Sequence, residues 1–382
     1  MKKLTLLLTS TLTILAGTII APAIPTIEKV LQPEEGISLM VSFILTITSL
    51  FIALGAPLSG WIADTWGRKR LLLASLTLYA LSGSAGLFLA TSEQILISRM
   101  ILGLAVSGVM TCSTTLIADY FFGDEREQFL GYQVAFMAIG GFLFLVSGGI
   151  LASYWWHAPF AIYLVSLLLI PPVALVIDEP ERKQKVVPQS QPFPKLLYIF
   201  VVLTAMMGMM LYFLIPTRLP YYLDILHNVS PYQTGFFMGA GTLFISFMAT
   251  RYHTIHERFS KPFIYAVSFL VMGIGLELIA FVPTVTLVFV SVAVTGLGFG
   301  LNLPNSTVWV SQLAPEVYRG RMIGILTSAI FLGQFLSTLF GEPLFRHNGL
   351  QGIAGVYGVG GLVGLTIGAL YVIYGLIHRR QT

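Results

Sequence analysis

Charged residues are scarce in this chain. Only 10% of its 382 residues are Asp, Glu, Lys or Arg, whereas 56% are hydrophobic, and the mean hydropathy is +0.84. Soluble domains carry roughly 25% charged residues. A chain of this length with so few charges cannot cover its surface with groups that water solvates. Its surface must therefore face something other than water, which is typical of a membrane protein.

Cysteine is almost absent, since Cys112 is the single one. One thiol excludes a disulfide framework and a cysteine-based metal cluster. The net charge of +4 is spread over short loops and lacks the basic face of a nucleic-acid binder. His253 and His256 beside Glu257 are a weak metal-site pattern, and metalloprotease, serine-hydrolase and P-loop motifs are missing. We predict no enzyme, no catalytic or metal-binding residue, no cofactor and no nucleic-acid partner.

Long apolar runs dominate what is present. A helix needs about 20 apolar residues to cross the hydrocarbon core, and these runs are continuous rather than alternating, which favours helices over a barrel. The first run could pass for a signal peptide, but the many similar runs after it favour a retained span. The sequence predicts an all-α membrane protein with twelve transmembrane helices, near residues 4–25, 38–62, 71–90, 95–119, 127–152, 159–177, 196–215, 233–250, 262–282, 285–312, 320–342 and 352–377.

Lys and Arg are distributed unevenly between the loops. With the N-terminus placed inside, all but four of the 21 basic residues fall on the inner side; Lys29, Arg218 and Arg346 fall outside, and Arg99 falls within a span. Cytoplasmic loops carry the excess of basic residues. The distribution predicts that both termini are cytoplasmic and that the number of spans is even.

The two halves of the chain are related. A proline-rich polar stretch, 178–195, separates an N-terminal bundle (1–177) from a C-terminal bundle (196–382) and is expected to be an extended cytoplasmic tether. A shift of 193 residues places Gly67 on Ser260, Arg126 on Arg319, and Gly103, Gly131, Gly140 and Gly148 on Gly296, Gly324, Gly333 and Gly341. These matches indicate a parallel internal repeat, an arrangement found in transporters with binding sites at the repeat interface.

The loop between spans two and three carries a specific motif. It reads Gly60-Trp-Ile-Ala-Asp64-Thr-Trp-Gly67-Arg68-Lys69-Arg70-Leu71. Gly60 permits close helix approach, Gly67 permits a tight turn, and Arg68 and Lys69 suit an anionic leaflet. The segment resembles the signature loop of the major facilitator superfamily and departs from it at Thr65. The resemblance implies two six-helix bundles, and a loop whose Asp and Arg latch them in the outward-facing state. The alternative is a topological anchor without a gating role.

Shorter stretches resemble the drug/proton antiporters of that family. Residues 21–25 are similar to the end of their first span, and Arg99 with Gly103 to the Arg-x-x-x-Gly of their fourth. Span five departs from the antiporter pattern, because Phe144-Leu145 stands where these proteins have Gly-Pro. Span one also lacks an acidic residue. The resemblance implies a monomeric secondary transporter in the cytoplasmic membrane of a prokaryote that exports drug-like or metabolite solutes, with a proton as coupling ion. Uptake of a small metabolite, including an anionic one, and flipping of a lipid-like amphiphile remain alternatives.

Two ionisable residues, Arg99 and Glu277, stand well inside predicted spans, and such residues are candidates for function. The family resemblance places span four, which carries Arg99, beside the central cavity, where Arg99 would bind an anionic group; the alternative is a snorkelling side chain. Glu277 in span nine is a candidate proton carrier. The same resemblance makes span nine peripheral, which favours the alternative that Glu277 faces other helices or lipid headgroups.

Uncharged polar residues supply the remaining candidates. Asn302, Asn305 and Trp309 share one face of span ten, since they are three and four residues apart. Such a face suits a polar, partly apolar solute. Gln133 in span five and Gln334 in span eleven are further candidates for contact with the solute. For all of these, the alternative is hydrogen bonding between helices.

The gating hypothesis makes a direct prediction. We expect Asp64→Asn to reduce transport in reconstituted vesicles while the amount of protein inserted in the membrane stays normal, because the carboxylate beside the three cations is lost. Full activity of this variant would leave the loop as a topological anchor.

Overall fold

The computed structural model describes residues 1–31, 39–121, 123–180, 193–227, 229–281, 284–315, 318–342 and 349–378, and the regular structure in these ranges is helical. Apolar runs become helices because lipid offers no partner to a backbone amide, which must bond within its own segment. Eleven helical stretches among the described residues are long and apolar enough to cross a membrane. The predicted all-α membrane fold is confirmed.

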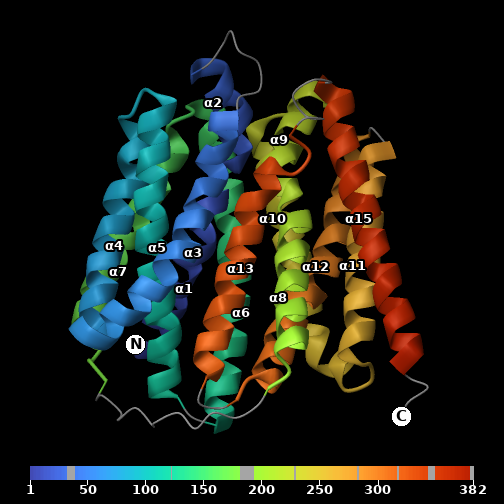
Figure 1. Cartoon of the computed structure of the whole chain (residues 1–382). Coiled ribbons are helices and arrows are strands. Elements are labelled where there is room, and N and C mark those ends of the chain that lie inside the picture. Colours follow the sequence, from blue (N-terminus) through green and yellow to red (C-terminus); the bar gives the residue numbers. More distant parts are fainter. Residues whose placement is uncertain are drawn as a thin grey trace. The chain divides into compact units, whose positions relative to one another are not determined.

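The chain divides into two compact units, the first of which comprises Met1–Lys185 and Ser230–Gly239. The division between residues 185 and 186 falls in the predicted linker. Figure 1 shows α3, α4 and α5 alongside one another, and α5 packs on both of the others. The elements of this unit are α1 (Lys2–Thr18), η1 (Ala21–Ala23), α2 (Ile24–Leu31), α3 (Leu39–Trp66), α4 (Arg68–Ser84), η2 (Ala85–Leu87), α5 (Ser92–Tyr120), α6 (Gly123–Tyr154), η3 (Ala158–Leu164) and α7 (Val165–Val176).

The second unit comprises Val186–Val229 and Ala240–Thr382. Its most extensive helix pairs are α11 with α15 and α11 with α12. The elements that follow the linker are α8 (Lys195–Tyr212), α9 (Leu214–His227), α10 (Pro231–His256), α11 (Lys261–Phe281), α12 (Val285–Leu313), α13 (Arg319–Leu339) and α15 (Gly349–His378).

Each of the twelve predicted spans coincides with a helix or a run of consecutive helices. The eighth, 233–250, lies in α10, which is not among the eleven stretches because glycine and threonine lower its hydropathy. Its 26 residues still measure about 39 Å at 1.5 Å per residue, enough to cross the hydrocarbon core. The first stretch extends to Leu31 and the seventh to Ile225, beyond their predicted ends. The prediction of orientation counted Arg346, and the predicted linker includes residues 181–192. Both lie outside the described residues.

The packing of glycines supports the internal repeat. A Cβ atom added at Gly103 of α5 would lie 2.5 Å from the carbonyl oxygen of Thr48 in α3. A Cβ at Gly296, the matching position in α12, would lie 2.8 Å from the carbonyl oxygen of Gly241 in α10. Span four therefore packs on span two in the first unit as span ten packs on span eight in the second.

A second set of matched glycines agrees. Gly140 of α6 lies against α1, and Gly333 of α13 lies against α8, so spans five and eleven have equivalent partners. Gly131 and Gly324 also match, since nothing lies within 4 Å of a Cβ at either position. Small residues let helix backbones approach closely where lipid provides no hydrophobic drive to associate.

These contacts predict a symmetric pattern of stability. We expect Gly103→Ala and Gly296→Ala each to lower the free energy of unfolding by about 1–3 kcal/mol, because the methyl group meets backbone that must shift. The matched controls, Gly131→Ala and Gly324→Ala, should be neutral or slightly stabilising, since alanine favours a helix where space is open. Unfolding of the purified variants in detergent measures all four. Equal effects at the packed and open positions would contradict the packing assignment.

Candidate functional site

The turn between α3 and α4 is the best-defined part of the candidate gating loop. Gly67 has φ of +107°, a value that L side chains rarely adopt, and is the N-cap of α4. The carboxylate of Glu179 accepts hydrogen bonds from the backbone N–H groups of Arg68 (2.6 Å) and Lys69 (2.9 Å). A Cβ at position 67 would lie 3.0 Å from that carboxylate. The positive φ favours glycine here, and the tight turn predicted at Gly67 is confirmed.

Arg68 also joins the turn to the end of α5. Its guanidinium forms an ion pair with Asp119, and their side chains are only 25% and 20% exposed. A partly buried, charge-assisted pair is stronger than one in open solvent. Sequence analysis missed both acidic partners, Asp119 and Glu179. The only available signal was their position, since each stands at the inner end of a predicted span.

The start of the predicted linker is held rather than free. The ammonium of Lys2 hydrogen-bonds the carboxylate of Asp178 at 2.5 Å, and the hydroxyl of Tyr120 donates to the Asp178 carbonyl. Together with the Glu179 cap on α4, these contacts form a clasp that holds residues 178 and 179. Glu179 is held because a helix start leaves backbone N–H groups that need an acceptor. The extended tether stays a prediction for residues 181–192, which lie outside the described residues.

The clasp has a defined pH sensitivity. The hydrogen bond and charge of Lys2 hold the pKa of the Asp178 carboxyl below its usual range. Because the pKa is lowered in the folded protein, this contact contributes stability above the pKa of the unfolded chain. That contribution is lost as the pH falls through the folded pKa.

The other residues of the candidate gating loop are more open. Asp64 is exposed on the last turn of α3, and the side chain of Lys69 is half-buried. Nothing lies within 4 Å of a Cβ at Gly60, so the close helix approach predicted there is not made in this structure.

Arg99 lies inside the first unit and is fully buried. Its guanidinium donates to the backbone carbonyls of Ser82 (3.1 Å) and Gly83 (2.6 Å) in the last turn of α4. It also stands over the rings of Phe160 and Tyr163 of η3, 5.0 and 4.9 Å from their centroids. The side chain is buried and so is not a snorkelling arginine: its Nη2 satisfies carbonyls that the end of α4 leaves open. Its Nη1 has no hydrogen-bond partner among the described residues, so contact with a solute stays a prediction.

The polar face predicted on α12 is largely used for packing. Asn305 accepts a hydrogen bond from the hydroxyl of Tyr252 (3.1 Å) and donates one to the carbonyl of Lys261 (3.1 Å). Trp309 is buried with its ring 5.6 Å from that of Tyr265 in α11. For both residues the structure matches the alternative of hydrogen bonding or packing between helices.

Asn302 differs from these neighbours. It is 1% exposed, it faces Gly208 of α8, and its amide nitrogen has no hydrogen-bond partner among the described residues. Beside it, the rings of Tyr212 in α8 and Phe299 in α12 stack with centroids 4.4 Å apart. An unused buried donor costs about 1–3 kcal/mol, so Asn302 is the strongest candidate on α12 for contact with a solute.

The remaining candidates have structural surroundings. Gln133 donates to the hydroxyl of Ser10 in α1 at 2.8 Å, and Gln334 is buried on α13. Glu277 lies on α11 against Gly358 and Gly361 of α15, so it faces protein. This contact agrees with the peripheral position that the family resemblance implied for spans nine and twelve.

Two buried charged residues escaped sequence analysis. Arg218, assigned to an outer loop, instead lies within α9, where it donates to the Thr338 carbonyl (2.6 Å) and pairs with Glu342 (2.9 Å). Glu28 is 6% exposed in α2, within the first membrane-crossing stretch, Lys2–Leu31. The expectation of no acid in span one is wrong, because the helix continues past the predicted end at residue 25.

The two helical units, the glycine-packed repeat and the charged turn define a multi-pass membrane transporter built from duplicated halves. The chain belongs to the Major Facilitator Superfamily, whose family model matches residues 6–254 and 254–380. It is accordingly a transporter and not an enzyme.

Known proteins resemble the chain over most of its length. The bacillibactin exporter of Bacillus subtilis (strain 168) is 25% identical over 352 residues, which are 87% of this chain and 85% of that protein. The class H tetracycline resistance protein of Pasteurella multocida is 22% identical over 378 residues, or 95% and 93% of the two chains. The crystal structure of a D-xylose–proton symporter shares the fold, with a TM-score of 0.77 at 17% identity over 96% of both chains.

The cap on α4 can be tested by stability. We expect Glu179→Gln to lower the free energy of unfolding by about 0.5–2 kcal/mol, as loss of an N-cap does, because an amide offers one acceptor instead of two. The control is Glu125→Gln, which breaks an exposed pair with Lys3 (2.7 Å) and should have little effect. Thermal unfolding in detergent compares the variants, and equal shifts would argue against the cap.

Proposed function

We propose that this chain exports a small drug-like or metabolite solute across the cytoplasmic membrane of a prokaryote in exchange for protons, by alternating access between its two units. The similarity to the bacillibactin exporter and the class H tetracycline resistance protein, over more than four-fifths of each chain, supports export. The excess of basic residues in the predicted inner loops supports cytoplasmic termini. The transporter acts as a monomer.

The observation that carries the proton-coupled mechanism is the buried carboxylate of Glu28. Exchange for protons needs an acidic group that binds and releases a proton within the membrane, and ionisable residues placed there are candidates for this role. Glu28 is 6% exposed and belongs to the first membrane-crossing stretch. Glu277 is the less suitable acid, because it packs on the glycines of a neighbouring helix.

Asn302 and the Tyr212–Phe299 stack are the proposed contacts for the solute in the second unit. A polar donor beside stacked rings suits a solute with an apolar ring system and a hydrogen-bond acceptor. Tetracycline and bacillibactin, which two relatives' names mention, are therefore the first probes to use.

Inside-out vesicles with an imposed pH gradient test the direction and the coupling. Export in exchange for protons predicts that an acidic vesicle interior drives accumulation of the probe. Accumulation only with the opposite gradient would support uptake, and no response to either gradient would overturn proton coupling.

Glu28 is tested in the same vesicles. We expect Glu28→Gln to reduce gradient-driven accumulation to the level of protein-free vesicles, because an amide cannot carry a proton, while thermal stabilisation by the probe persists. Glu277→Gln, which removes another acid from a span, should retain transport. If both variants transport normally, Glu28 is not the proton carrier.

A further inference from the structure

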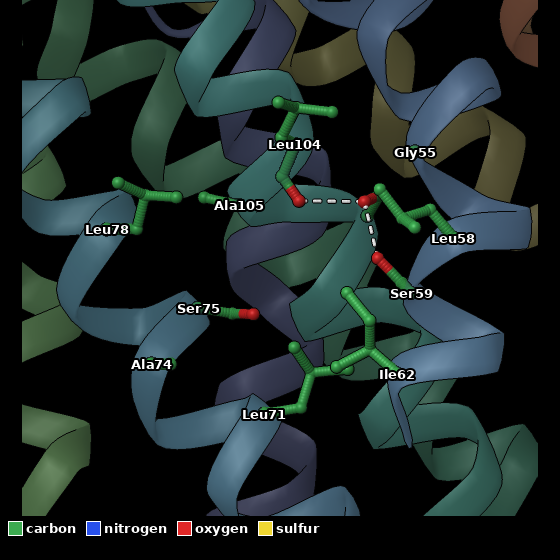
Figure 2. Close-up of a pocket in the computed structure, with 11 residues that line it drawn as sticks. Gly55, Leu58, Ser59, Ile62, Leu71, Ala74, Ser75, Leu78, Leu104 and Ala105 are labelled. Atoms are coloured by element: carbon green, nitrogen blue, oxygen red, sulfur yellow. Dashed lines mark hydrogen bonds between the residues drawn. The ribbon is translucent and has the colours of Figure 1, made fainter. Parts of the chain in front are cut away.

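A pocket of about 190 Å³ opens on the face of the first unit between α3, α4 and α5 (Figure 2). Its rim includes Leu58, Leu78 and Leu104, which are 52%, 39% and 39% exposed. Sites for whole small-molecule ligands typically have volumes of about 300–1,000 Å³. The pocket is thus too small for a drug-like solute, and its apolar opening suits part of a flexible chain that enters from the side.

The polar atoms of the wall are largely satisfied by the protein. The hydroxyl of Ser107 donates to the Leu104 carbonyl at 2.7 Å, and the hydroxyl of Ser59 lies 2.8 Å from that of Ser107. Because the Ser107 proton is directed to the carbonyl, Ser59 is the donor of this second bond. These two serines therefore do not require a polar ligand, and an apolar guest leaves their hydrogen bonds intact.

One end of the pocket has the residues of a lipid headgroup region. On α4, Arg70 is exposed and precedes Ala74 and Leu78 at four-residue steps, so the three share one face and the cation lies one turn from the pocket. On α3, Trp66 follows Ile62 in the same way and is 49% exposed. Tryptophan concentrates at membrane interfaces, and exposed basic residues there attract anionic lipids.

We propose that this pocket binds one acyl chain of an anionic phospholipid whose phosphate lies at Arg70. Ser75 directs its hydroxyl toward the pocket (Figure 2) and is placed to donate to the ester of the same lipid. The acyl chain of this lipid contacts Ile62 and Leu71, which flank the α3–α4 turn. A bound lipid thereby braces the turn that Gly67 and Glu179 shape.

Photolabelling tests the proposal. The full chain is purified in detergent, incubated with phosphatidylglycerol that carries a diazirine in one acyl chain, irradiated and mapped by mass spectrometry. We expect labels on Leu58, Leu78 and Leu104. Ala74→Phe should abolish them, because Ala74 is exposed at the rim and the ring fills the pocket without displacing a buried side chain. Thr77→Phe, exposed on the same helix outside the pocket, should label like the wild type.

Arg70→Gln and a matched diazirine phosphatidylcholine test the headgroup. Either change should reduce labelling about fivefold, the factor that corresponds to roughly 1 kcal/mol for one basic residue at an anionic surface. Unchanged labelling in Ala74→Phe, or label spread evenly over other exposed leucines, overturns the pocket assignment. Equal labelling by both lipids overturns the choice of an anionic lipid. If the phenylalanine variant aggregates, Ala74→Leu provides the same comparison with a smaller side chain.

Discussion

The structure depends on one constraint, that backbone polar groups removed from water must find a partner inside the protein. Helices meet it along their length but leave open N–H groups at the start and carbonyls at the end. Here remote charged side chains complete helix ends. In the buried interior, Arg99 donates to the last carbonyls of α4 and Arg218 donates to the Thr338 carbonyl near the end of α13. At the exposed start of α4, where water also competes, Glu179 accepts from the first N–H groups. Charges that are rare in this chain are therefore used where the backbone needs them.

Close packing through glycine is the second organising feature. In lipid the helices gain little from the hydrophobic effect, so association depends on contact between backbones. Gly103 of α5 packs against α3 as Gly296 of α12 packs against α10, and Gly140 and Gly333 also make equivalent contacts. At these matched positions of the two units a side chain has no room, whereas Gly148 and Gly341 do not make equivalent contacts.

Polar residues within the membrane differ in how much of their hydrogen-bonding capacity the protein itself uses. Asn305 and Gln133 join neighbouring helices through the bonds they make. Asn302 keeps an amide nitrogen without a partner among the described residues, and Glu28 places a carboxylate in the first span. In the proposed mechanism these two side chains have separate tasks, Asn302 toward the solute and Glu28 toward the proton.

The sequence alone determined the membrane environment, the helical class, the repeat and the loop that identifies the family, because these follow from composition, run length and local motifs. It also predicted the tight turn at Gly67. Tertiary structure decided which polar residues are buried and which of them bond to other helices, since a hydrogen bond depends on partners that lie far apart in the chain. Arg99 and Asn305 looked suited to a cavity but bond backbone carbonyls, whereas Glu28 was overlooked because only the folded helix shows that the first span continues past residue 25.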